Sequence, residues 1–293
     1  MSAALSPAAS PLVRLAPFAF IALWSTSFIT ARVGLQHVSP LYFVTLRLLG
    51  ATLLLLLLCA ITRASWVSLR GRWWRLALAG ALLNGVALAA FHVAMVTVNA
   101  AVIALLQSLN PLIIALLAVP MLGERLGWKA WVGLVLGAVG VAIVVAPKAL
   151  GTEAEVEAMV LGAIGIAGLA GGTLLYGQHG RGVALLPATT VQLGAAAVLG
   201  MVLTALFETP VSDNSAVAWI TIGWNIVAVS VGGMALYYFM LNRGAAGRVA
   251  ANFYLVPGVV GIAGWLLLGE ALAPLAVAGL VLASIGVFLV ARR

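Results

Sequence analysis

The feature that most constrains the fold of this chain is a series of long apolar runs separated by short polar segments. Several runs exceed the roughly 20 apolar residues that a helix needs to cross a hydrocarbon layer of about 30 Å. Runs of this length favour a helix bundle over the short alternating strands of a membrane barrel. We therefore predict an all-α integral membrane protein with ten transmembrane helices. These spans cover approximately residues 15–35, 40–61, 73–94, 98–120, 127–146, 158–178, 187–207, 216–239, 246–267 and 273–291.

The composition excludes several other classes of protein. Charged residues make up 8% of the chain and hydrophobic residues 64%, whereas soluble domains carry about 25% charged residues. The net charge of +8 lies in short loops between apolar runs, so it does not indicate nucleic-acid binding. Cys59 is the only cysteine, and no Cys or His cluster has the spacing of metal ligands. With no phosphate-binding Gly-Lys-Ser/Thr loop either, we expect no metal, no cofactor and no enzyme activity.

The lysines and arginines predict the orientation in the membrane, because cytoplasmic loops carry an excess of these residues. With ten spans and a cytoplasmic N-terminus, most of the basic residues fall on the cytoplasmic side. Every acidic residue except Glu124 falls on the opposite side. We therefore expect a multi-pass protein of the cell membrane with both termini in the cytoplasm.

The chain also repeats itself with a constant offset of about half its length. Pro111 recurs as Pro257, and the Leu-Gly-Glu block that ends at Glu124 recurs at Glu270. Repeats are a guide to architecture, and this one predicts four segments. They are a cytoplasmic segment 1–14, a first five-helix repeat 15–146, an external linker 147–157 and a second five-helix repeat 158–291. Since five is odd, the second repeat is inverted in the membrane, an arrangement typical of secondary transporters with a substrate site near the midplane.

Several motifs resemble the EamA-like branch of the drug/metabolite transporter superfamily. Trp-Ser-Thr-Ser-Phe at 24–28 is similar to its first-span signature, and Pro40 followed by Arg47 to its second span. Asn-Pro-Leu at 110–112, followed by Gly-Glu-Arg-Leu at 123–126, resembles its fourth and fifth spans. The resemblance covers essentially the whole chain. It implies two inverted five-helix repeats and export of amino acids or related metabolites, with aromatic and neutral amino-acid exporters the most similar group.

The resemblance also implies a central cavity surrounded by spans one, three, four, six, eight and nine, with spans five and ten as a peripheral scaffold. Polar and aromatic residues of these spans predict a mostly apolar pocket with a few neutral hydrogen-bonding groups, as expected for a small molecule. We predict as substrate-binding residues Trp24, Ser27, Phe28, Asn84, Phe91, His92, Met95, Gln107, Tyr176, Tyr237, Asn252 and Tyr254. A neutral pocket suits a zwitterionic amino acid better than a cation or a polyanion. His92 is the one mid-span group that titrates near neutral pH, so proton-coupled and facilitated export both stay open.

Four further residues are expected at hinges and gates. Pro111 and Pro257 each interrupt the hydrogen bonding of a span, which favours a hinge over a static bend because they occur at matched positions. Glu124 and Glu270 follow these spans, and we interpret them as helix caps or gate latches rather than substrate contacts.

Arg47 and the glycines allow two interpretations each. Arg47 lies deep in a span with no acid at comparable depth, so it either binds a substrate carboxylate or has a structural role. The glycine pairs of spans five and ten favour close helix packing. The row from Gly162 to Gly171 either packs or lines a cavity.

Together these features predict an inner-membrane transporter that exports neutral amino acids, preferably large apolar or aromatic ones, by alternating access. Its expected partners are a small-molecule substrate and the lipid bilayer, with no nucleic acid, and we expect a monomer. A carrier of drugs or lipid-linked metabolites is the main alternative. A membrane-embedded lipid enzyme and a non-transporting structural membrane protein are less favoured.

Overall fold

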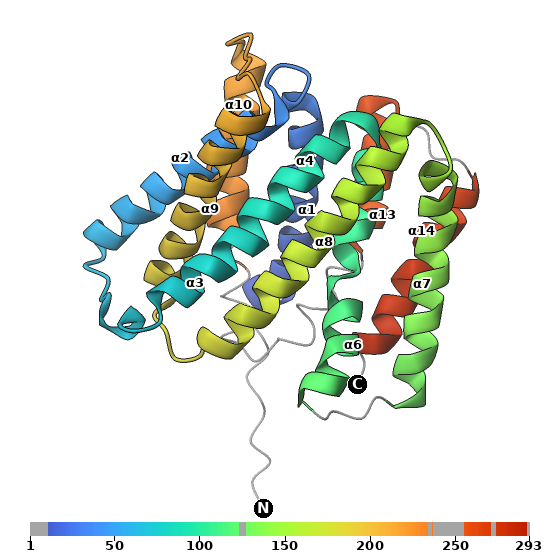
Figure 1. Ribbon diagram of the computed structural model, residues 1–293, viewed down its shortest axis with the longest axis horizontal. Helices are drawn as coiled ribbons and strands as arrows, with labels where there is room; N and C mark the ends of the chain where they lie inside the picture. Colours follow the sequence, from blue (N-terminus) through green and yellow to red (C-terminus); the bar gives the residue numbers. More distant parts are fainter. Residues whose placement is uncertain (1–10, 123–126, 234–235, 237–254, 271–273, 292–293) are drawn as a thin grey trace, which may run out of the picture.

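The computed structural model describes residues 11–122, 127–233, 236, 255–270 and 274–291, and this part of the chain folds into helices without a named strand (Figure 1). The first half contains α1 (Pro11–Gly34), α2 (Pro40–Ile61), η1 (Val67–Leu69), α3 (Trp73–Gly80), η2 (Ala81–Val86), α4 (Ala87–Thr97), α5 (Ala100–Ser108), α6 (Asn110–Leu122) and α7 (Trp128–Ala149). The second half contains α8 (Glu153–His179), α9 (Leu185–Phe207), α10 (Ala216–Trp224), η3 (Asn225–Gly233), α13 (Val256–Leu268) and α14 (Pro274–Ala291).

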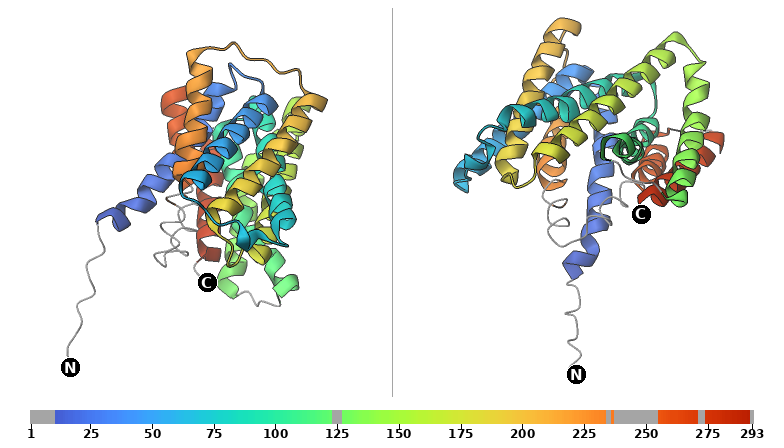
Figure 2. Two further views of the ribbon diagram at one scale, coloured as in Figure 1. Left: turned by 90° about the vertical axis from the view of Figure 1, so that its left-hand side faces the viewer. Right: turned by 60° about the horizontal axis from the view of Figure 1, so that its bottom comes forward.

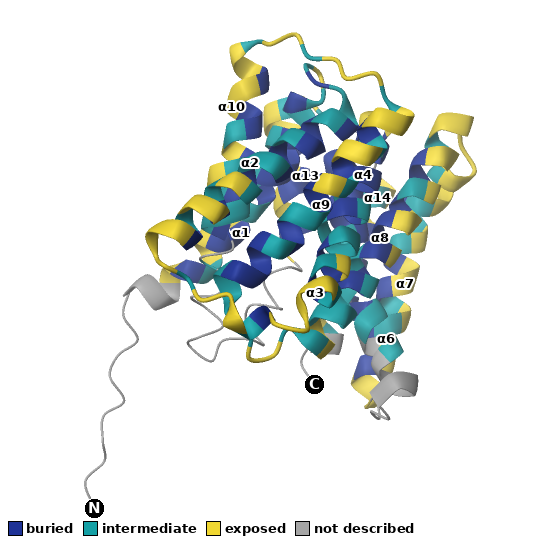
Figure 3. Cartoon of the chain, turned by 60° about the vertical axis from the view of Figure 1, so that its left-hand side comes forward, coloured by how far each residue is buried: buried dark blue, intermediate teal, exposed yellow. Residues whose placement is uncertain are grey.

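Within these described residues, seven helical stretches are long and apolar enough to cross a membrane. They are Leu15–Gly34, Pro40–Ile61, Trp73–Thr97, Trp128–Ala149, Glu153–His179, Leu185–Phe207 and Ala216–Gly233. Shorter apolar helices cover Ala100–Ile114, Val256–Leu268 and Pro274–Gly286. The prediction of a helical membrane protein is thereby confirmed, whereas the number of ten spans stays a prediction. Large apolar side chains such as Leu57 and Ile220 face outward, as Figure 3 shows for the exposed helix faces, and this surface suits contact with lipid.

The core joins helices from both halves of the chain. The largest buried apolar cluster includes Phe28 of α1, Phe91 of α4, Ile103 of α5 and Val260 of α13. A second cluster lies between α2 and α9. Helices far apart in the sequence therefore lie side by side, and the first five helices do not form a separate core.

Helices α7 and α14 lie next to each other at one edge of the bundle (Figures 1 and 2). A Cβ added at Gly140 would lie 2.6 Å from Gly279 O, and one at Gly286 would lie 2.6 Å from Gly133 O. Backbones come this close only where side chains are small, so the packing role of these glycines is confirmed. In the repeat, Gly133 and Gly140 correspond to Gly279 and Gly286. The contact between Gly140 and Gly279 therefore corresponds to the contact between Gly286 and Gly133, as in an isologous interface between two equivalent units.

The glycines of α8 also serve packing. Gly168 and Gly172 face the third predicted span: added Cβ atoms would lie 2.9 Å from Leu82 O and 2.6 Å from Ala79 O. Gly165 faces the ring of Phe91, and a Cβ added at Gly165 would lie 2.6 Å from Cε1 of that ring. Of the two interpretations of this glycine row, close packing is the one that the structure favours.

Two spans are interrupted by π-helical turns, in which the backbone bonds from residue i to i+5. One is η2, between α3 and α4, and the other is η3, which continues α10. In the repeat that matches Pro111 with Pro257, residues 81–86 of η2 correspond to residues 227–232, which lie within η3. The same local irregularity therefore occurs at matched places in the two halves.

The structure also changes several predicted boundaries. The fourth predicted span is broken: α5 ends at Ser108 and α6 begins at Asn110, with Pro111 in its first turn. Pro257 likewise lies in the first turn of α13, where a missing N–H removes no helical hydrogen bond. Helices α7 and α8 extend into the predicted linker 147–157, so that only residues 150–152 lie between the two helices. Helix α8 begins early because Thr152 and Glu155 form a capping box.

Candidate functional site

A small buried cavity lies between α1, α2, α4 and α5. It is lined, among the described residues, by Trp24, Ser27, Phe28, Ala31, Arg47, Leu88, Phe91, His92, Met95 and Gln107. The residues from α1 and those from α4 each follow the spacing i, i+3, i+4, i+7, so each set forms one stripe on one helix face. The space open to the centres of water-sized molecules is about 30 Å³, which is room for about two waters.

Most of the predicted binding residues that the structure describes line this one cavity, but two do not. Asn84 lies in η2, and the π-helical turn shifts the register, so the stripe through Leu88 and His92 does not extend back to it. Tyr176 lies in the last turn of α8 and packs against a small cluster formed by Leu69, Leu76 and Ala188. Three others, Tyr237, Asn252 and Tyr254, and the predicted gate residue Glu124 lie outside the described residues.

Arg47, which was absent from the predicted binding set, belongs to the cavity wall. It is only 7% exposed. Its Nη1 donates to Ser27 Oγ at 3.3 Å, and Ser27 Oγ donates to Asn225 Oδ1 at 2.9 Å. The Nδ2 of Asn225 donates to Thr30 Oγ1 at 2.9 Å and to Thr221 O at 3.0 Å. A chain of hydrogen bonds with a fixed direction thus holds one side of the guanidinium.

Two buried nitrogens in the cavity wall have no hydrogen-bond partner among the residues that the structure describes. They are Nε of Arg47 and Nε2 of His92. The other ring nitrogen of His92 lies 2.7 Å from Leu88 O. Since a carbonyl only accepts, Nδ1 carries the proton, and in the neutral ring Nε2 is an acceptor. The cavity wall therefore combines a charged guanidinium that has unused N–H groups, Nε among them, with the acceptor Nε2 of His92 in mostly apolar surroundings.

One end of the bundle is closed directly beyond this cavity, and we call it the Glu270 end. Gly269 has a φ of +66°, and this left-handed residue ends α13 and turns Glu270 back toward the bundle. Glu270 Oε1 lies 2.8 Å from Arg32 Nε, and Oε2 accepts from the N–H of Ala100, at the start of α5, at 3.3 Å. Arg32 also donates to the carbonyl of Met95 and to that of Val96 at 3.1 Å. This set of contacts, the Arg32–Glu270 latch, ties together the ends of α1, α4 and α13 and the start of α5.

The sequence profile of the EamA-like transporter family matches residues 14–146 and 157–292 of the chain. This protein belongs to the EamA-like transporter family. Membership confirms the resemblance seen in the sequence, and it confirms a membrane transporter rather than an enzyme.

The chain is similar to two further proteins over most of its length. It is 27% identical over 278 residues to Protein PecM of Dickeya dadantii (strain 3937), which covers 92% of this chain and 89% of PecM. It is also similar to a protein of known crystal structure, with a TM-score of 0.65 and 20% identity, covering 96% of this chain and 98% of that one. At this identity the likeness to the crystal structure shows the fold alone.

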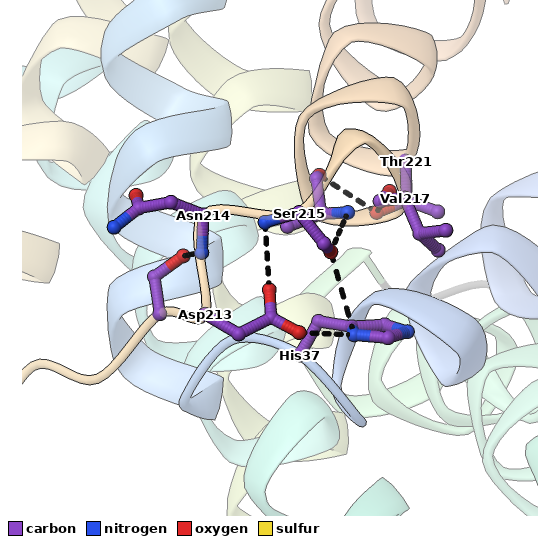
Figure 4. Close-up of polar contacts among 8 residues, drawn as sticks. His37, Asp213, Asn214, Ser215, Val217 and Thr221 are labelled. Carbon is purple, nitrogen blue, oxygen red and sulfur yellow. Dashed lines mark hydrogen bonds and ion pairs between the residues drawn. The ribbon is translucent and has the colours of Figure 1, made fainter.

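A second polar cluster of this EamA-like transporter joins two loops at the Glu270 end (Figure 4). Asp213 Oδ2 lies 2.6 Å from His37 Nδ1, and Ser215 Oγ lies 3.4 Å from the same nitrogen. A nucleophilic triad needs the serine and the acid on different ring nitrogens. Here Ser215 instead caps α10 by accepting from the N–H of Ala218. The cluster is therefore structural.

The hydrogen bonds of this loop cluster also act on Asp213. The backbone N–H of Ser215, and then the ring of His37, lower the pKa of Asp213 to about 2. A bridge between Val38 and Ser212 runs beside it. The α1–α2 and α9–α10 loops are thus fastened together by an acid that stays ionised at any physiological pH.

Proposed function

We propose that this transporter exports neutral amino acids across the cell membrane, with a preference for large apolar or aromatic side chains. The observation that supports this substrate class is the composition of the cavity wall. Trp24, Phe28, Phe91 and Met95 supply apolar and aromatic surface. Ser27, Gln107 and His92 supply uncharged polar groups, and Arg47 supplies one charge. Such a wall suits a small molecule with one apolar and one polar end.

We further propose ten spans in two inverted repeats, with α5–α6, α13 and α14 adding to the seven long stretches. Three observations support this architecture. The α7–α14 contacts exchange under the repeat, the π-helical turns fall at matched places, and the family profile matches each half separately. With the termini in the cytoplasm, as the basic residues indicate, the Glu270 end faces the outside.

Transport then proceeds by alternating access. The cavity is too small for an amino acid while the Arg32–Glu270 latch is closed, so the helices around it must separate to admit and release substrate. The break between α5 and α6, next to Pro111, and the start of α13 at Pro257 are the proposed hinges, because helix ends absorb changes in backbone angle most easily. We place Tyr237, Asn252 and Tyr254 in the substrate path and Glu124 in a gate at the opposite end, on the sequence alone.

Counterflow in liposomes tests the substrate class. Purified protein in vesicles preloaded with unlabelled amino acids is offered labelled phenylalanine, methionine, threonine, lysine or glutamate, with and without a pH gradient. We expect uptake of phenylalanine and methionine above that of empty vesicles, and no uptake of lysine or glutamate. Dependence on the gradient would assign proton coupling. Absence of uptake for all five would contradict the proposal and direct the assay to drugs and lipid-linked metabolites.

A further inference from the structure

We propose that Arg47 binds the carboxylate of the substrate and that Nε2 of His92 accepts a hydrogen bond from its ammonium group. This inference rests on the proposed function, since it states how the same cavity recognises an amino acid. It also predicts a single orientation for the substrate, with its backbone at Arg47 and its side chain against the aromatic wall.

The first argument is charge. Arg47 is buried, and isolated buried charges are costly unless they are paired. Each acid among the described residues lies elsewhere: Glu153, Glu155 and Glu157 lie at the start of α8, Glu208 bonds the backbone at the start of α2, Asp213 pairs with His37 and Glu270 with Arg32. The described part of the chain thus supplies no carboxylate to Arg47, and the carboxylate of a substrate would balance its charge.

The second argument is geometry. The bond to Ser27 Oγ occupies Nη1 of Arg47, and the proton of Ser27 is directed to Asn225, so Ser27 must accept from the guanidinium. Nε has no partner. A guanidinium binds a carboxylate best through two parallel N–H groups, and Nε is available as one of them. Ser27 and Asn225 are therefore positioning residues that hold the fork in place.

The third argument is that the acceptor lies in the same wall. The ring of His92 is fixed by its bond to Leu88 O and by stacking on Phe43, with ring centroids 5.7 Å apart. Its free Nε2 accepts and Arg47 Nε donates, which matches the ammonium and carboxylate of a zwitterion. In the second half, no arginine follows Pro187, which matches Pro40. A polar residue of that span, Gln192, donates to Ala188 O within its own helix. The first half of the chain therefore contains this subsite and the second half has no counterpart of it.

Competition in the counterflow assay tests the proposal on the wild-type protein. The competitors of labelled phenylalanine are unlabelled phenylalanine, phenylalaninamide, which lacks the carboxylate, and 3-phenylpropionate, which lacks the ammonium group. We expect the amide to compete at least about tenfold more weakly than phenylalanine, as for the loss of one hydrogen-bonded charge. Equal competition by the amide, with phenylalanine transported, would overturn the carboxylate subsite and leave the proposed function intact.

Variants test whether Arg47 causes the preference for phenylalanine over phenylalaninamide. In Arg47→Gln we expect phenylalanine to lose its advantage over the amide, so that the two differ by less than about twofold. Ser27→Asp places a carboxylate beside Arg47 and should abolish phenylalanine transport while the protein stays folded, judged by an unchanged or higher Tm. Ser25→Ala is the matched control, because Ser25 is buried in the same helix with an unbonded hydroxyl and lies outside the cavity. Retention of the advantage of phenylalanine in Arg47→Gln would refute the role of Arg47.

A binding readout keeps the inference testable if no amino acid is transported. Thermal shift of the purified protein is measured with 3-phenylpropionate and with phenethylamine. We expect the carboxylate to raise the Tm of the wild type and not that of Arg47→Gln, and phenethylamine to have the weaker effect. No shift with 3-phenylpropionate would overturn the subsite independently of transport.

Discussion

Arg32 lies in the last turn of α1 and Arg47 lies inside α2, and the two arginines have very different surroundings. Arg32 has a carboxylate at 2.8 Å and two backbone carbonyls, and its side chain is 24% exposed. Arg47 is more deeply buried, touches one hydroxyl, and has no acid beside it in the described residues. We call an arginine matched when a carboxylate of the protein pairs with it, and such an arginine stabilises the fold. An unmatched arginine has no such carboxylate and can bind the carboxylate of a ligand. The two should therefore respond to mutation in opposite ways.

The largest effect on stability is expected at the matched pair. Glu270→Gln removes the charge that faces Arg32 and weakens a bond to the N–H of Ala100. We expect the free energy of unfolding to fall by about 2 kcal/mol, as for a charged hydrogen bond, measured as a fall in Tm in detergent. Arg32→Gln should destabilise as much or more, because Arg32 also bonds the carbonyls that end α4. A Tm equal to the wild type in both variants would show that the latch does not hold the bundle.

The Glu270→Gln substitution should also make the cavity more accessible from the Glu270 end. In a Cys59→Ala background, a cysteine at Ser27 reports access of a membrane-impermeant maleimide from the Glu270 end. We expect labelling to be slow in the parent and about tenfold faster when Glu270→Gln is added, within the range of coupling energies between sites. Asp213→Asn is the matched control, since it removes an acid at the same end that does not contact Arg32. Equal labelling with and without Glu270→Gln would contradict the gate role of this residue.

A smaller effect on stability, and one of opposite sign, is expected when the unmatched Arg47 is replaced. Replacing Arg47 by Gln removes a buried charge that lacks a counter-charge, and buried charges often stabilise less than neutral groups of similar size. We expect Arg47→Gln to leave the Tm unchanged or raise it, by an equivalent of at most about 1 kcal/mol. Arg47→Lys keeps the charge and should show no such gain. A large fall in Tm for Arg47→Gln would make this arginine structural, like Arg32.

These two arginines also show how far the sequence could predict the site. The sequence singled out Trp24, Ser27 and Phe28 in the first span and Phe91, His92 and Met95 in the third, and both sets line the cavity. Regular helices make such predictions possible. Asn84 does not line this cavity, because it lies in a π-helical turn that changes the register, and the sequence gives no sign of that turn.

Long-range pairing is the part that spacing cannot predict. Arg32 and Glu270 are separated by 238 residues, and Asn225 is a single amide within an apolar run, with no pattern to connect it to Ser27. The sequence did identify Arg47 as unmatched in charge, and the signal for its place in the cavity was that imbalance. The helix ends near Thr152 were misplaced because a capping box extends α8 into a stretch that is polar in composition.

The smallest effect is expected at the loop cluster of His37 and Asp213, which is open to solvent. The pKa of Asp213 is lowered to about 2 from an ordinary value of 3.8. Its contribution to stability is therefore complete above about pH 4 and is lost as the pH falls through 2. We expect the difference in Tm between the wild type and Asp213→Asn to be small and constant from pH 7 to pH 5, and to shrink only below about pH 4. Solvent screening keeps it below the effect of Glu270→Gln. A difference that already changes between pH 7 and pH 5 would contradict this expectation and show that a group other than Asp213 controls the pH response of the loops at the Glu270 end.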